Sequence, residues 1–334
     1  MDCEPEELQF LGLIGICREA SKLIVSWRRL FSQISSSLIV PLSILFLAHI
    51  QISHFLFSQI DRNENALEHT AAGSPSERRL LHRISSEWSA FLLFKALYLV
   101  ALLIFSLLST AAVVYTIASA YTAKHDLLLS YRKVLSVVPK VWRRLAHTFL
   151  FAFLILLAYN IVVILVFVFV IILAGNSVAG IICAIAIFLA YLAGLVWISV
   201  VWHVASVVSV LEDARGAAAM ARSRELVRGK MWLAAFIFVM MNMAFLGIEL
   251  AFRQLVVVGA LPAVGRLGLA VAMLALLSVV VLFALVVQTV VYFVCKSYHH
   301  ESIDKSALAD HLEVYLGEYM PLKERDVQME QLRV

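Results

Sequence analysis

The stretch HTFLFAFLILLAYNIVVILVFVFVIILA, residues 147–174, decides the fold class of this chain. It contains no Asp, Glu, Lys or Arg, and it is longer than the roughly 20 apolar residues that a helix needs to cross a hydrocarbon core. Inside a bilayer a helix satisfies its backbone polar groups internally, which an open strand or loop cannot do. The stretch therefore predicts a membrane-spanning helix.

Five other stretches have the same character, and the composition agrees with them. Of the 334 residues, 62% are hydrophobic and 15% are charged, against roughly 45–50% and about 25% in average soluble chains. We expect six spans, at residues 37–57, 90–122, 147–174, 178–204, 231–252 and 267–295. The expected fold class is an all-α, polytopic membrane protein.

The distribution of Lys and Arg predicts the orientation of these spans, because basic residues are retained on the cytoplasmic side. With the N-terminus in the cytosol, 20 of these residues fall on the cytoplasmic side and six on the other, while Lys95 alone lies within a span. We therefore expect both termini in the cytosol, and a location in the endoplasmic reticulum, the secretory pathway or the plasma membrane.

This orientation divides the chain into three parts. They are a cytoplasmic N-terminal segment over residues 1–36, a transmembrane domain over 37–295, and a cytoplasmic tail over 296–334 with a short helix at 306–316. Within the domain we expect cytoplasmic loops at 123–146 and 205–230. Residues 58–89 are mostly polar around Gly73, Ser74 and Pro75, and we expect them to form a mobile outer loop.

A basic amphipathic stretch precedes each span that leads outward. The three read REASKLIVSWRRLF (18–31), SYRKVLSVVPKVWRRLAH (130–147) and ARSRELVRGKMWLAAF (221–236). They predict three helical hairpins, each preceded by an interfacial helix with its apolar face in the acyl boundary. The cations expected to bind anionic lipid or a cytosolic protein are Arg28, Arg29, Arg143, Arg144, Arg222, Arg224, Arg228 and Lys230. Alternatively, these cations only follow the positive-inside rule, and the Trp residues belong to an aromatic belt.

The stretch LEDARGAAAMARSRELVRGKMW, residues 211–232, predicts an ordered cytoplasmic helix. Ala217, Ala218 and Ala219 favour a helix, and Gly229 favours its termination. Opposite charges recur at i, i+3 in the pairs Glu212 and Arg215, Arg222 and Glu225, and Glu225 and Arg228. Residues at this spacing share one helical face.

The same stretch resembles the signature loop of the membrane domain found beside bacterial glycerophosphodiester phosphodiesterases. Over most of residues 20–295 the chain is also similar to an uncharacterised plant family of six-span membrane proteins. The positions that carry the resemblance are Glu212, Asp213, Gly216, Ala219, Arg222, Ser223, Leu226, Val227, Gly229 and Trp232. The resemblance implies a membrane module and an architecture, and it implies no catalytic activity.

No motif in the sequence favours an enzyme. The sequence contains no G-x-S-x-G, H-E-x-x-H, Walker A or G-x-G-x-x-G pattern. We therefore expect no catalytic residues, no metal and no cofactor. A net charge of +4 is too small to favour nucleic acid as a partner, and the sequence leaves the oligomeric state open.

A few polar residues lie at mid-membrane depth, where unpaired polar groups are costly. Asn160, Asn242 and Gln288 predict either hydrogen bonds between helices or a path for a small solute, which they would line together with Ser106, Ser109 and Thr110. The leading hypothesis is a non-catalytic scaffold, membrane-organising or trafficking factor, and the alternative is a small-solute channel or transporter lined by these amides.

Small residues recur along the fourth span and predict a face for close helix packing. They are Gly180, Ala184, Ala186, Ala190 and Gly194. Small residues let two helix backbones approach closely in a membrane. We expect this face to contact a neighbouring span of the same chain rather than a second copy.

Overall fold

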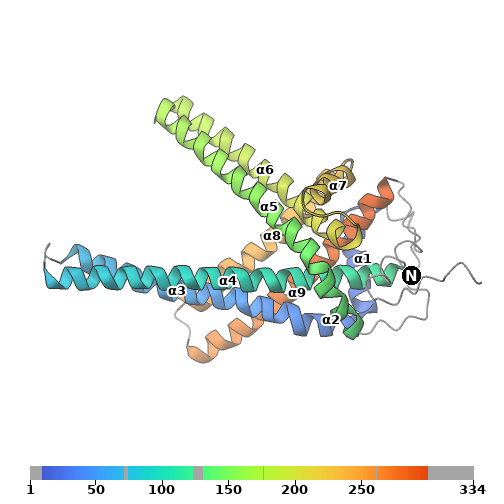
Figure 1. The fold of residues 1–334 in the computed structure, drawn as a ribbon, viewed down its shortest axis with the longest axis horizontal. Coiled ribbons are helices and arrows are strands. Elements are labelled where there is room, and N and C mark those ends of the chain that lie inside the picture. The colour runs from blue at the N-terminus through green and yellow to red at the C-terminus, as the bar shows by residue number, and fades with distance from the viewer. Residues whose placement is uncertain (1–9, 71–73, 123–130, 176, 260–261, 300–334) are drawn as a thin grey trace, which may run out of the picture.

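The computed structural model describes residues 10–70, 74–122, 131–175, 177–259 and 262–299, and within these ranges it contains helices and no strands (Figure 1). The helices are α1 (Leu13–Ser26), α2 (Arg28–Ile34), α3 (Val40–Glu68), α4 (Pro75–Thr122), α5 (Tyr131–Ala174), α6 (Val178–Leu211), α7 (Ala217–Val227), α8 (Met231–Phe252) and α9 (Ala263–Tyr298). Two π-helical segments, Ser35–Ile39 and Arg253–Val258, precede α3 and follow α8. The expected all-α class is confirmed for the described residues.

Six helical stretches among the described residues are long and apolar enough to cross a membrane. They are Arg28–Glu68, Pro75–Tyr121, Val141–Leu173, Val178–Leu211, Met231–Val258 and Ala263–Tyr298. Each expected span coincides with one of them, which indicates a multi-pass integral membrane protein. The cytoplasmic tail expected at 296–334 is described only as far as residue 299, and the short helix expected at 306–316 lies outside the described residues.

The long helices lie side by side in sequential pairs that diverge from one common end (Figure 1). The pairs α3–α4 and α5–α6 extend in different directions from this end, where α1, α2 and α7 are also found. We call it the junction end. The three short helices therefore gather where the spans converge.

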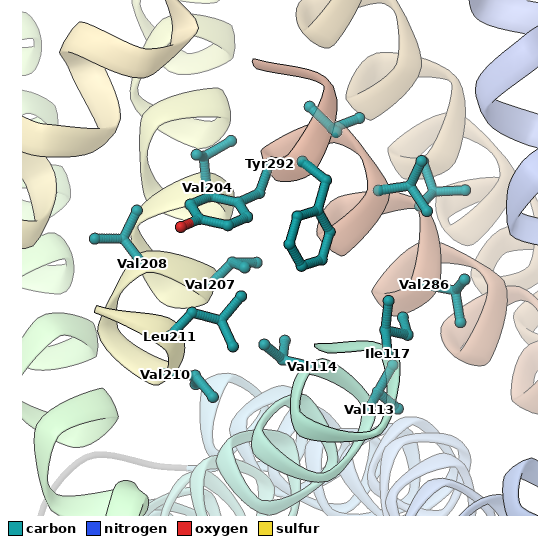
Figure 2. Close-up of a cluster of buried hydrophobic side chains, with 14 of the residues drawn as sticks. Val113, Val114, Ile117, Val204, Val207, Val208, Val210, Leu211, Val286 and Tyr292 are labelled. Atoms are coloured by element: carbon teal, nitrogen blue, oxygen red, sulfur yellow. The ribbon is translucent and has the colours of Figure 1, made fainter. Parts of the chain in front are cut away.

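The larger buried core lies at the junction end. A second, smaller cluster packs α3 against α9, α8 and the π-helical segment that follows α8, and consists of Leu47, Ile248, Phe252, Val256 and Leu277. Figure 2 shows part of the larger core, with Val113, Val114 and Ile117 from α4, Val204, Val207, Val208 and Leu211 from α6, and Val286 and Tyr292 from α9. The opposite ends of α5 and α6 are different, because Ile172 and Val178 are highly exposed there. In water such exposure costs about 25 cal/mol per Å², whereas lipid tails solvate these side chains as well as protein does.

The expected outer loop at residues 58–89 is instead mostly helical. Helix α3 continues to Glu68 and α4 begins at Pro75, and Asn63 donates to Glu87 at 2.8 Å between the two helices. Helix α4 has 48 residues, or about 72 Å at 1.5 Å per residue, which exceeds a hydrocarbon core of about 30 Å. The polar residues up to Glu68 and from Pro75 onward therefore extend the two helices.

The expected loops at 123–146 and 205–230 are also shorter than predicted, because helices occupy most of them. Helix α5 begins at Tyr131, and α6 continues to Leu211. The three amphipathic stretches consequently differ from one another. The second is continuous with its span in α5, whereas the first contains a break at Trp27. The third is divided between the end of α7 and the start of α8.

The small-residue face of α6 contacts α5 of the same chain at Gly194. The hydroxyl of Tyr159 on α5 donates to the carbonyl oxygen of Tyr191 at 3.2 Å, and a Cβ atom added at Gly194 would overlap that hydroxyl and ring carbon Cζ. The absence of a side chain at Gly194 therefore allows Tyr159 to reach the backbone of α6. The expectation of a contact within the chain is confirmed at this position.

We predict that Gly194→Leu lowers the free energy of unfolding by about 1–3 kcal/mol, the usual cost of overpacking, because the new side chain displaces Tyr159 from its carbonyl acceptors. Thermal unfolding in detergent micelles measures the effect. The matched control is Gly247→Leu in α8, because an added Cβ at Gly247 has no heavy atom within 4 Å. Equal destabilisation by both variants would contradict the assigned packing role.

Candidate functional site

The residue that follows α6, Glu212, lies where three helices meet at the junction end. Its carboxylate accepts hydrogen bonds from the Tyr292 hydroxyl at 2.7 Å and from Lys296 Nζ at 3.3 Å, both on α9. Arg222 Nε, on α7, donates to the other carboxylate oxygen at 3.3 Å. The Glu212 side chain is only 20% exposed. We call these four residues the Glu212 cluster, and they join α6, α7 and α9.

The surroundings of Glu212 favour its ionised form. Burial by itself raises the pKa of the carboxyl group, but the hydrogen bond from Tyr292 and the charges of Lys296 and Arg222 together hold the pKa below its ordinary value. Hydrogen bonds to the charged form and nearby opposite charges both act in this direction. The cluster is therefore a paired, partly buried ionic group at neutral pH.

The residues after Glu212 connect the same loop to α5. Asp213 accepts a hydrogen bond from Arg144 at 2.6 Å, and the backbone N–H of Gly216 donates to the Thr148 hydroxyl at 2.8 Å. Gly216 has φ +58°, a conformation that glycine adopts without a Cβ penalty. The acidic pair and the glycine of the 211–232 stretch thus hold four helices together.

The expected charge pairs of this stretch are only partly present. Arg222 lies 3.9 Å from Glu225 as expected, but Glu212 binds Arg222 and Lys296 rather than Arg215. Helix α7 ends at Val227, and Gly229 has φ +89°, which confirms the predicted helix termination. The pairing prediction failed for Glu212 because the backbone there is extended and outside the helix.

The eight cations proposed as lipid or partner ligands fall into groups with different surroundings. Arg144 and Arg222 form the internal ion pairs described above. Lys230 Nζ lies 5.4 Å from the centre of the Tyr298 ring. The exposed members are Arg28, Arg29, Arg143, Arg224 and Arg228. The sequence therefore identified surface cations, but it could not separate them from two cations that pair with carboxylates of the same chain.

The three mid-membrane amides lie in two different places. Asn160 accepts a hydrogen bond from the Tyr191 hydroxyl at 2.8 Å, between α5 and α6. Gln288 donates to the Ser206 hydroxyl at 2.6 Å, while Asn242 donates to the Phe238 carbonyl of its own helix at 2.8 Å. The prediction of hydrogen bonds between helices is thus confirmed for Asn160 and Gln288.

Asn242 and Gln288 also line a cavity of about 430 Å³ between α3, α4, α6, α8 and α9. Ser106, which the sequence had placed beside the amides, lines it as well, together with Ser43 and His203. Ser43 and His203 were missed, because no short-range pattern indicates which residues of five separated helices meet. Asn160, Ser109 and Thr110 are not among the lining residues.

Within the described residues, no group of three or more His, Cys, Asp or Glu side chains is arranged to hold a metal ion. His299, which follows α9, has its Nε2 atom 3.1 Å from the carbonyl oxygens of Leu226 and Arg228. This histidine therefore contacts the end of α7.

Residues 1–332 match the family described as a domain of unknown function, DUF8558, and the chain belongs to that family. No curated protein matches the chain, and no solved structure matches it either. The resemblance to the plant six-span family and to the phosphodiesterase-associated membrane domain stays an expectation, since none of these findings tests it.

We predict that Glu212→Gln lowers the free energy of unfolding by about 1.5–3 kcal/mol, the usual contribution of hydrogen bonds to charged groups. The substitution leaves Lys296 and Arg222 close together without their counter-charge. Thermal unfolding in micelles at pH 7 measures the loss. Glu225→Gln is the control, because Glu225 is 67% exposed and exposed ion pairs contribute only about 0–1 kcal/mol.

The same comparison has a defined pH dependence. Since the pKa of Glu212 is lowered in the folded protein, its stabilising contribution is present above the unfolded value of about 4.3 and is lost as the pH falls through the folded value. The difference between the wild type and Glu212→Gln should therefore shrink below about pH 4. A difference that stays constant down to pH 3 would contradict an ionic role.

Proposed function

We propose that this DUF8558 protein is a non-catalytic integral membrane protein that organises membranes or assists trafficking in the secretory pathway or at the plasma membrane. In this proposal the junction end lies at the cytosolic surface and binds anionic lipid headgroups or a cytosolic protein. The observation that carries the proposal is that the buried core and five exposed arginines lie at the same end of a set of apolar spans.

The expected topology is part of this proposal. Helices α3–α4, α5–α6 and α8–α9 would form three hairpins with both chain termini in the cytosol. The excess of Lys and Arg in the connections at the junction end supports this orientation. Helices α1 and α7 and the start of α5 would then lie near the membrane surface, since each carries both basic and apolar residues.

Exposed side chains near α7 support contact with a lipid surface. Arg228 is exposed at the end of α7, and Trp232, four residues later at the start of α8, is 90% exposed. Tryptophan is enriched at membrane interfaces because its ring is apolar and its N–H is polar. Each Lys or Arg near an anionic leaflet contributes on the order of 1 kcal/mol.

The alternative, a path for a small solute, has less support. Asn160 bonds to Tyr191 between α5 and α6, so the three amides do not line one continuous path. The cavity beside Asn242 and Gln288 is mainly apolar. In this proposal the amides therefore have a structural role and do not line a path for a solute.

We predict that cysteines introduced at opposite ends of the spans react from opposite sides of the membrane. Glu68→Cys, at the end of α3, should be labelled in intact cells by an impermeant maleimide, provided that the protein is at the plasma membrane. Ala221→Cys, in α7, should be labelled only after the membrane is permeabilised. In sealed organelles the accessibility reverses, and labelling of both sites from one side would exclude the topology.

We predict that charge reversal at exposed junction-end arginines weakens binding to anionic membranes. Full-length protein in phosphatidylcholine nanodiscs is sedimented with vesicles that contain phosphatidylserine. Arg28→Glu combined with Arg228→Glu should reduce binding on the order of 30-fold or more, from about 1 kcal/mol per lost cation. The effect should diminish with added salt, because salt screens exposed charges.

The control is Arg253→Glu, which reverses the charge of one exposed arginine beyond α8, at a distance from α2 and α7. This variant should bind as the wild type does. Arg144 and Arg222 are left unchanged, because their substitution would break internal ion pairs. Equal loss of binding with Arg253→Glu, or no loss with the double variant, would refute the lipid-binding role of the junction end.

A further inference from the structure

The cavity between α3, α4, α6, α8 and α9 has the size and lining of a ligand site. Its volume of about 430 Å³ falls within the roughly 300–1,000 Å³ of known small-molecule pockets. Eleven of its sixteen lining residues are apolar, among them Phe46, Phe245 and Leu277, and five are polar. A mainly apolar wall with a few polar groups is typical of such pockets.

One polar group on this wall lacks a partner. Ser43, in α3, is 1% exposed, and among the described residues its Oγ atom makes no hydrogen bond. Serine hydroxyls inside helices commonly donate to a carbonyl of the preceding turn, as Ser278 does to Leu274 at 2.8 Å. A buried hydroxyl without a partner is costly, so Ser43 points to a ligand that carries a hydrogen-bonding group.

The lining also excludes charge from the ligand. No Asp, Glu, Lys or Arg is among the lining residues, and a charged group buried without a partner is strongly unfavourable. The remaining polar groups are the amides of Asn242 and Gln288, the Ser106 hydroxyl and the His203 ring. Gln288 is already paired, because its amide bonds His203 Nδ1 at 3.1 Å and Ser206 Oγ at 2.6 Å. Ser43 and Asn242 therefore remain as the groups that match a hydroxyl, which both donates and accepts hydrogen bonds.

The cavity is accessible from the side of α8. Asn242, on its wall, is exposed, and its helix neighbours Met240 and Met243 are large exposed apolar residues. In a membrane-spanning helix these neighbours face lipid tails. A ligand reaching Asn242 from this side would therefore arrive from the bilayer rather than from water.

We propose that this cavity binds an uncharged membrane lipid with a free hydroxyl head group and an apolar body, of the acylglycerol class. The apolar body contacts the Phe46, Phe245 and Leu277 side of the wall. The hydroxyl head group pairs with Ser43 and with the amide of Asn242. This site is separate from the basic surface of the junction end. The basic surface binds anionic headgroups in our proposal, whereas the cavity binds an uncharged lipid.

The experiment uses a diazirine-bearing analogue of 1-oleoylglycerol with the full-length protein in phosphatidylcholine nanodiscs. After irradiation, mass spectrometry of the digested protein should place the crosslinks on lining peptides of α3, α8 and α9. Unlabelled 1-oleoylglycerol should compete at least about fivefold better than oleate at pH 9, since the two share a chain and differ in head-group charge.

Two variants test the site itself. Ala284→Trp, on the cavity wall, should reduce crosslinking at least about fivefold by filling the space. Ala275→Trp is the matched control on the exposed side of the same helix and should leave crosslinking unchanged. Ser43→Ala should weaken binding roughly threefold to tenfold, the equivalent of one hydrogen bond.

Thermal unfolding in nanodiscs is measured for each variant, and Ser43→Ala carries the test if Ala284→Trp does not fold. The proposal is overturned if oleate competes as well as 1-oleoylglycerol, or if crosslinks are scattered over lipid-facing residues. It is also overturned if Ser43→Ala, or a folded Ala284→Trp, binds the probe as the wild type does.

Discussion

The pairing of the Glu212 carboxylate with Tyr292, Lys296 and Arg222 is the interaction on which the junction end depends. Lipid tails are as apolar as Leu, so spans that contact lipid gain little hydrophobic free energy by packing together. Specific association must then come from polar contacts and from the close van der Waals packing of a buried core. The Glu212 cluster and the valine-rich core beside it provide both at one end (Figure 2).

The divergence of the helix pairs follows from the same constraint. The far ends of α5 and α6 carry mainly exposed apolar side chains, and their mutual contact at Gly194 and Tyr159 joins them only to each other. No comparable polar contact draws these ends toward α3, α4, α8 or α9 within the described residues. The cavity lined by Ser43 and Gln288 lies between the diverging helices.

The spans were predictable because length and hydropathy are local properties, whereas the site was not, because its contacts are distant in sequence. Arg222 and Glu225 were paired correctly, since their spacing of three residues lies within one helix. The partner of Lys296 is 84 residues away, and no periodicity encodes that distance. The outer loop was predicted wrongly for a local reason: polar composition indicates exposure to water and does not by itself exclude a helix.

The cavity and the Glu212 cluster both lie where α6 contacts α9. On α6, His203 precedes Glu212 by nine residues, and on α9, Gln288 precedes Lys296 by eight, so the two sites lie about 12–14 Å apart along each helix. Gln288 donates to Ser206 across the same interface. A ligand that binds only the folded cavity stabilises the folded state by mass action. Lipid in the cavity would thus strengthen the α6–α9 contact that also positions α7 and its exposed arginines.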